Sequence, residues 1–182
     1  MGRLPSQAEP NGLRRLAANA AGTGSKEDGM AGLTVGDEAP DFTLPSTQGE
    51  VTLSERLGSE GGDRNVLLVF YPGDDTPVCT RQLCDYRDNL SAFELLGVDV
   101  LGINPQDLAS HERFAEKHGL SFPLLSDADK RVCREYGALS LFGMAKRALV
   151  LVGPNRRVRW SRVDFPIFHR SAAELEDVIS GL

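Results

Sequence analysis

The chain has few cysteines, no surplus of positive charge and no long apolar run, and each absence excludes a class of protein. Its 182 residues include only three cysteines and three histidines, whereas a small secreted domain held by disulfides carries more cysteines, in even number. Neither CxxC nor HxxxH spacing occurs, so we expect no metal, haem or flavin cofactor. The formal net charge of −6 argues against nucleic-acid binding. No apolar run approaches the roughly 18 residues of a membrane span.

Residues 1–29 differ in composition from the rest of the chain. They are rich in Gly, Ala and small polar residues and have few large apolar ones, which is typical of a segment that does not pack into a core. They also lack the apolar core of a signal peptide. We therefore predict a flexible N-terminal extension, 1–29, and one folded domain, 30–182, which is long enough for a full hydrophobic core.

The remaining sequence alternates between strand-like and helix-like patterns. Hydrophobic periodicity and turn residues predict strands at 42–44, 51–53, 65–71, 98–104, 147–152 and 158–163, and helices at 77–96, 108–118, 127–136 and from Ser171. The first two strands and the last two strands should each form an antiparallel hairpin, and the strands on either side of 77–96 should pair in parallel. The predicted fold class is α/β, with a mixed central β-sheet flanked by helices and an N-terminal β-hairpin.

The segment NVLLVFYPGDDTPVCTRQLC places two thiols just after a buried strand. Thr76 is a good N-cap and Pro77 suits the first helical position, so Cys79 becomes the third residue of a helix. Unpaired backbone N–H groups and the helix dipole favour negative charge there, and the thiolate is the reactive form of cysteine. The alternative is a buried, inert cysteine on the apolar side of the helix.

The second thiol, Cys84, follows Cys79 by five positions. In an intact α-helix this spacing separates the Cα atoms by about 8–9 Å, whereas a disulfide needs less than about 7 Å. We therefore predict that one or two turns must unwind before the thiols can pair. A CxxC pair needs no such opening.

The segment YPGDDTPVCTRQLCDYRD strongly resembles the active-site segment of peroxiredoxins, especially the bacterioferritin comigratory protein or peroxiredoxin Q subfamily. The resemblance extends from about Gly36 to Leu182 and includes SHERFAEKHGLSFPLLSD and RALVLV. It implies a thioredoxin-like fold. It also implies an antioxidant thiol peroxidase that reduces hydrogen peroxide and organic hydroperoxides through a sulfenic acid.

The resemblance implies a role for each matching residue. Cys79 is expected to be the peroxidatic thiolate and Cys84 the resolving thiol of an atypical 2-Cys peroxidase with an intramolecular Cys79–Cys84 disulfide. Thr76 is expected to hydrogen-bond the sulfur and the peroxide, Pro72 to shield the site from water, and Arg147 to hold the thiolate. Without the resemblance, Arg147 would be interpreted as a solvated charge at the end of a strand.

The implied partners are a peroxide substrate and thioredoxin or a similar dithiol reductant. Since members of this subfamily are often monomeric, we expect a monomer. We expect it in the cytoplasm, with organelle targeting by 1–29 as the alternative. Cys133 has no place in the two-cysteine scheme and is interpreted as a packing residue.

Two other functions are considered beside the peroxidase. One is a non-enzymatic redox switch or holdase, in which the disulfide remodels a partner surface. The other is a thioredoxin-type thiol–disulfide exchange protein, which requires CxxC and a proline just before the late strand. Gln82 and the segment 144–146 stand at those places, so the sequence disfavours the exchange protein.

Overall fold

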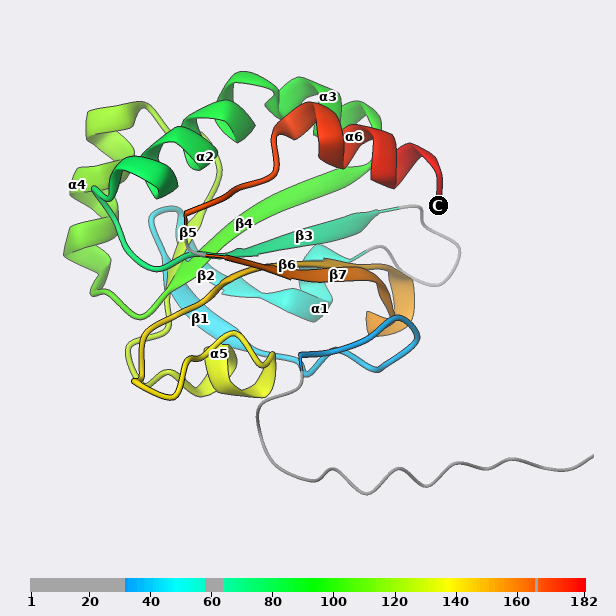
Figure 1. The fold of residues 1–182 in the computed structure, drawn as a ribbon, viewed down its shortest axis with the longest axis horizontal. Helices are drawn as coiled ribbons and strands as arrows, with labels where there is room; N and C mark the ends of the chain where they lie inside the picture. The colour runs from blue at the N-terminus through cyan, green and yellow to red at the C-terminus, as the bar shows by residue number, and fades with distance from the viewer. Residues whose placement is uncertain (1–31, 58–63, 166) are drawn as a thin grey trace, which may run out of the picture.

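A computed structural model describes residues 32–57, 64–165 and 167–182, so the predicted extension 1–29 lies outside the described residues. Within these ranges the chain forms one sheet with helices on both faces (Figure 1). Seven strands of the described chain lie in the order β2-β1-β5-β4-β3-β6-β7. They are β1 (Thr43–Ser46), β2 (Gly49–Thr52), β3 (Asn65–Phe70), β4 (Val98–Asn104), β5 (Leu124–Ser126), β6 (Arg147–Val152) and β7 (Val158–Asp164).

The sheet is mixed, as predicted. β3 pairs in parallel with β4, and β4 with β5. β1 and β2 form one antiparallel hairpin and β6 and β7 another, and β6 also pairs antiparallel with β3. The two hairpins and the α/β class are therefore confirmed. The sequence patterns missed β5, because three residues are too few to show a period.

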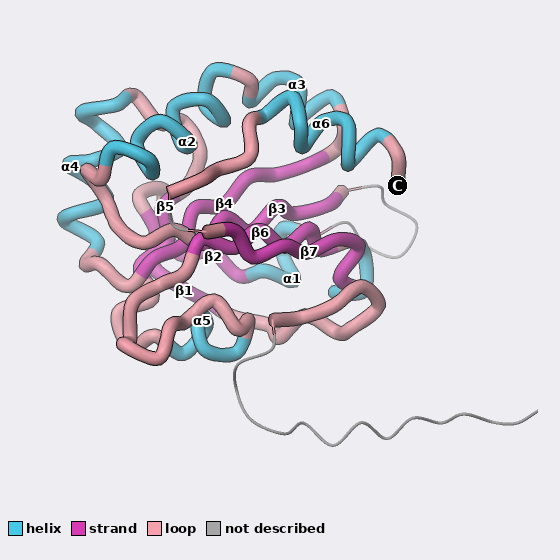
Figure 2. The backbone as a smooth tube through the Cα atoms, in the orientation of Figure 1, coloured by secondary structure: helices cyan, strands magenta, loops and turns pink. Residues whose placement is uncertain are grey.

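The helices are α1 (Leu53–Arg56), α2 (Pro77–Asp88), α3 (Leu90–Leu95), α4 (Leu108–His118), α5 (Arg131–Glu135) and α6 (Ala172–Ser180). Figure 2 shows α2, α3, α4 and α6 on one side of the sheet and α1 and α5 on the other. α1 was not predicted, and a single helix over 77–96 is wrong. The helix is interrupted at Asn89, whose side chain donates to the Asp85 carbonyl at 2.8 Å and so competes with the regular backbone bonds.

The predicted helix 127–136 is shorter than expected. It begins only at Arg131, because Lys130 has a left-handed backbone with φ of 60° that a continuous right-handed helix does not allow. The Asp127 carboxylate instead accepts the first free backbone N–H groups of α5, from Val132 and Cys133. The sequence signal for a helix was right, but its start lay four residues later than predicted.

β3 separates two hydrophobic cores. Its alternate residues Val66, Leu68 and Phe70 face the core beneath α1 and α5, while Leu67 and Val69 face the core beneath α2, α3, α4 and α6. A strand that is buried on both faces in this way reads as a continuous apolar run. The end of β3 leads into the loop 72–76 and then into α2, so the thiol motif follows the carboxyl end of a central strand.

Candidate active site

Cys79 is the third residue of α2, which begins at Pro77 after the N-cap position Thr76. Thr76 has the extended backbone angles φ −77° and ψ 139° that an N-cap residue adopts, but its side chain makes no capping hydrogen bond to the first turn of α2. The Cys79 side chain is fully buried in the core between α2 and the sheet. Its sulfur is therefore shielded from water and lies in the helical turn whose N–H groups have no partner within the helix.

Arg147, the first residue of β6, places its guanidinium against this sulfur. Its Nη2 donates to Cys79 Sγ at 3.2 Å. Only 1% of Arg147 is exposed, so the interpretation as a solvated strand-end charge is wrong. The reason is the sheet order, which sets β6 in the interior of the sheet between β3 and β7. A buried guanidinium at this distance can stabilise negative charge on the sulfur and on a reacting oxygen.

A chain of hydrogen bonds continues from Arg147 through the next turns of α2. Its Nη1 donates to Gln82 Oε1, and Gln82 Nε2 donates to Tyr86 Oη at 3.0 Å. Tyr86 Oη in turn donates to the Arg170 carbonyl at 2.9 Å, in the segment before α6. Gln82 and Tyr86 were not predicted as site residues. Their spacing of three and then four from Cys79 along one helix face was the signal that could have found them.

Two ionisable side chains in or near this series of hydrogen bonds have shifted pKa values. Burial raises the pKa of Tyr86 well above its usual range, so its hydroxyl remains a neutral donor. Partial burial and then the charge of Arg147 lower the pKa of His169. A neutral imidazole there adds no second positive charge next to the guanidinium.

Thr76 and Pro72 belong to the loop that enters α2. The Thr76 hydroxyl donates to the Gly73 carbonyl at 3.2 Å, so its proton is directed to a carbonyl rather than to the sulfur. Its oxygen lone pairs remain able to accept a hydrogen bond from a ligand. Pro72 is half-buried, and its shielding role stays a prediction.

Cys84 lies in the same uninterrupted helix as Cys79. It is half-buried, and both cysteines are free thiols. The spacing argument therefore applies to the observed α2: at about 8–9 Å between Cα atoms, the two thiols cannot bridge while the helix is intact.

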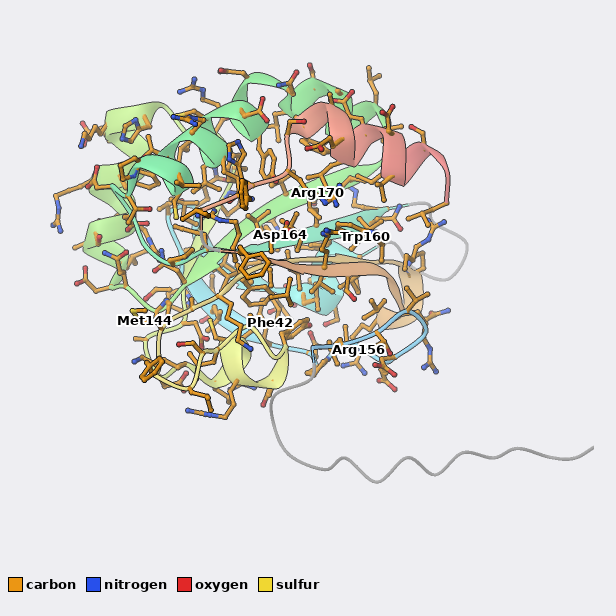
Figure 3. All side chains as sticks on the ribbon, in the orientation of Figure 1. Phe42, Met144, Arg156, Trp160, Asp164 and Arg170 are labelled. Carbon is orange, nitrogen blue, oxygen red and sulfur yellow. The ribbon has the colours of Figure 1, made fainter. Side chains whose placement is uncertain are left out.

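An open groove of about 360 Å³ lies beside the loop 72–76. Its walls are largely apolar, and the lining includes Pro72, Met144, Ala145, Val163 and Phe165. Met144 and Phe165 are 64% and 76% exposed, so large apolar side chains face solvent there. Figure 3 shows Met144 on the segment before β6 and Asp164, another lining residue, at the end of β7.

The described residues contain neither a candidate metal site nor a candidate membrane span. Among them, no group of three or more His, Cys, Asp or Glu side chains could hold a metal ion. In the same part of the chain, no helix combines the length and the apolar character needed to cross a membrane.

Known proteins resemble this chain in sequence over the region that forms the site. The sequence pattern of the AhpC/TSA family matches residues 35–161. Over 107 residues the chain is 43% identical to a putative peroxiredoxin bcp of Coxiella burnetii, which covers 59% of this chain and 68% of that protein. Over 144 residues it is 39% identical to the chloroplastic peroxiredoxin Q of Oryza sativa subsp. japonica, covering 78% of this chain and 63% of that protein.

The fold also has a counterpart among solved structures. The crystal structure of peroxidoxin BcpB from Mycobacterium tuberculosis matches with a TM-score of 0.72 and 28% identity, covering 82% of this chain and 98% of that chain. This likeness confirms the thioredoxin-like fold that the active-site segment implied.

Proposed function

The chain belongs to the AhpC/TSA family, with relatives in the bacterioferritin comigratory protein and peroxiredoxin Q subfamily, and from this we propose that it is a thiol peroxidase that reduces hydrogen peroxide and organic hydroperoxides. One observation carries the proposal: the buried Arg147 guanidinium donates to Cys79 Sγ at 3.2 Å at the start of α2. This arrangement supplies a nucleophile and a fixed positive charge at one point.

In the first step the Cys79 thiolate attacks the outer oxygen of ROOH. A sulfur–oxygen bond forms, the O–O bond breaks, and the peroxide proton passes to the departing oxygen, so that the products are a sulfenate, which becomes sulfenic acid on protonation, and ROH. The sulfur is oxidised by two electrons and the peroxide is reduced by two. Negative charge develops on both oxygens, within reach of Arg147.

The size of the required acceleration shows why donors matter. An ordinary thiol with a pKa of about 8.5 is only about 3% thiolate at pH 7, so complete ionisation gains roughly thirtyfold, or about 2 kcal/mol. One preorganised donor aimed at a developing negative charge is worth about 10²–10³-fold. We therefore assign most of the rate to Arg147 and to the free N–H groups of the first turn of α2. Thr76 Oγ1 would accept a hydrogen bond from the O–H of the incoming peroxide.

In the second step Cys84 displaces hydroxide from the Cys79 sulfenic acid. The disulfide forms, and the hydroxide leaves as water with the proton of the Cys84 thiol. Because Gln82 lies between the two cysteines, opening this part of α2 breaks its bonds to Arg147 and Tyr86. Net hydrogen bonds of this kind are worth about 0.5–3 kcal/mol each, so the opening is costly but within thermal reach.

An external dithiol, which we propose to be thioredoxin, returns both thiols to the reduced state by exchange. We further propose that the enzyme acts as a monomer in the cytoplasm. The relative in rice is named as chloroplastic, which makes an organelle the alternative location. Gel filtration and fractionation of cells that express the full chain test these two proposals.

The apolar groove beside Pro72 supports organic hydroperoxides as substrates. Its exposed Met144 and Phe165 could cover the alkyl part of ROOH while the peroxide group reaches Cys79. If so, Met144→Ala raises the KM for cumene hydroperoxide severalfold and leaves that for hydrogen peroxide unchanged. Equal effects on both peroxides would argue against the groove as a substrate site.

The decisive experiment is peroxide turnover coupled to thioredoxin, with Cys79→Ser and Cys84→Ser measured beside the wild type. We expect no turnover by Cys79→Ser. Cys84→Ser should react once, lose thioredoxin-dependent turnover and pass to sulfinic acid at lower peroxide. Mass spectrometry after one equivalent of peroxide should show the Cys79–Cys84 bridge. Consumption of a single equivalent in the presence of excess reductant would favour the redox switch instead.

A further inference from the structure

A buried carboxylate that the proposed cycle does not use lies in the loop between β3 and α2. Asp74 is 8% exposed, and its carboxylate has four hydrogen-bonding partners. Oδ1 accepts from Tyr71 Oη at 2.8 Å and from Asn104 Nδ2 at 3.1 Å. Oδ2 accepts from Ser110 Oγ at 2.8 Å and lies 2.9 Å from His111 Nδ1.

These partners come from three separate parts of the fold: the residue after β3, the end of β4 and the first turn of α4. The backbone N–H of Asp74 also donates to Gln106 Oε1, at 2.5 Å. A buried charge is tolerated only where such donors satisfy it. One side chain therefore ties the loop that carries Pro72 and Thr76 to two parallel strands and a helix.

The electrostatic environment keeps this side chain charged. Burial alone would raise the pKa of Asp74, but the hydrogen bond and charge of His111 and the hydroxyl groups of Ser110 and Tyr71 outweigh it and lower the pKa. Charge-assisted hydrogen bonds are stronger than neutral ones. The anchor is therefore at full strength at neutral pH.

The other end of the thiol segment is also held. The Asp85 carboxylate accepts from the Ala172 N–H at 2.7 Å, and Tyr86 Oη donates to the Arg170 carbonyl. Both bonds join α2 to the start of α6 or to the segment before it. The residues between the two anchors, 75–84, include both cysteines and are the part of the chain that must open for a disulfide to form.

We propose that Asp74 is a positioning residue for both chemical steps, an inference that rests on the proposed function. Its anchored carboxylate holds the loop 72–76 and the first turn of α2 around Cys79, which favours attack on the peroxide. The same anchor opposes the opening that brings Cys84 to Cys79. Loosening it therefore slows the first step and speeds the second.

The test compares Asp74→Asn with Asp75→Asn in the full chain. Both variants lose one negative charge from the same loop. Asp75, however, is exposed, and its ion pairs among the described residues are with side chains of α4, Lys117 at 2.5 Å and His118 at 3.7 Å. Its φ of 57° is a conformation that Asn adopts readily, so the control adds no backbone strain.

Two independent readouts are needed. Amide hydrogen exchange of the reduced protein should rise roughly tenfold over 72–79 in Asp74→Asn and stay at the wild-type level in Asp75→Asn. Rapid-quench mass spectrometry should show sulfenic acid formation slowed roughly tenfold, since a misplaced reactive group loses rate steeply. It should also show disulfide formation accelerated, with less sulfinic acid at high peroxide.

A residue that only stabilises the fold would not slow sulfenic acid formation and at the same time speed disulfide formation. If Asp74→Asn matches Asp75→Asn in hydrogen exchange, or slows both steps in proportion, the proposal is overturned. If Asp74→Asn does not fold, Ser110→Ala takes its place, because it removes one hydrogen-bond donor to Asp74. The same two measurements should then change in the same directions by smaller amounts. If the wild type forms no disulfide at all, the proposed cycle fails, while the exchange data still decide whether Asp74 holds the loop.

Discussion

Cys79 and Cys133 are two fully buried thiols that face opposite charges. Cys79 receives a hydrogen bond from the Arg147 guanidinium. Cys133 lies beside the Asp127 carboxylate, which accepts its backbone N–H at 2.7 Å. Burial and then the charge of Asp127 raise the pKa of Cys133 far above that of an ordinary thiol.

The comparison shows that burial by itself does not separate a reactive cysteine from an inert one. Both thiols have lost their water, and both lie near the start of a helix. The sign of the nearest charge differs, and this sign decides whether negative charge on sulfur is stabilised or penalised. Cys133 lies in the core beneath α1 and α5, which agrees with its interpretation as a packing residue.

The largest expected difference is in peroxide reduction itself. Cys79→Ser should reduce the rate by on the order of 10³-fold or more, because the nucleophile is gone. Cys133→Ser should change the rate of peroxide reduction by less than about twofold, because that thiol stays protonated and takes no part in the proposed cycle. Comparable losses in both variants, with both shown to be folded by circular dichroism, would contradict the assignment of Cys79 as reactive and Cys133 as inert.

The second-largest expected effect on the rate of peroxide reduction comes from removing the positive charge of Arg147, which faces Cys79. Arg147→Ala should slow hydrogen peroxide reduction by about 10²–10³-fold, even at a pH at which the thiol is fully ionised, because the donor acts on the transition state. Lys146→Ala is the control: it removes the neighbouring positive charge, whose Nζ donates to the Gly137 carbonyl. Recovery of the wild-type rate in Arg147→Ala at high pH would show that the arginine acts only through ionisation.

The charge facing Cys133 can be removed in the same way. Asp127→Asn should lower the free energy of unfolding by about 2 kcal/mol, because a charged acceptor of two buried N–H groups becomes neutral. Urea denaturation measures this loss. Iodoacetamide labelling should then reach Cys133 sooner and Cys79 at an unchanged rate. The exposed Asp129→Asn serves as control, and equal labelling of Cys133 in both variants would contradict the assignment.

The smallest effect is a pH dependence of stability. The raised pKa of Cys133 means that the folded thiol keeps its proton while the unfolded thiol loses it above about pH 8.5. The unfolded state then binds fewer protons, so the stabilisation present below pH 8.5 is lost as the pH rises, by about 1.4 kcal/mol at pH 9.5. Cys133→Ala should fall less steeply between pH 8 and 9.5 in urea denaturation, and parallel curves would refute the shift.

Much of the fold and part of the site were predictable from the sequence. The two hairpins, the parallel unit around α2, and the start of α2 at Pro77 depend on residues within a few positions of one another. For the same reason the position of Cys79 in the first turn of α2 was predictable. The break at Asn89 was not, because it depends on a competition between one side-chain bond and the backbone.

The tertiary structure determined which charged side chains lie beside the thiols. Cys79 and Arg147 are 68 positions apart, and only the antiparallel pairing of β6 with β3 brings them together. The same holds for Asp74, whose donors at Asn104 and Ser110 belong to β4 and α4. Periodicity and capping are local properties that a sequence displays directly. Which charge faces a buried sulfur depends on strand order and packing between distant segments, and these were visible only in the folded chain.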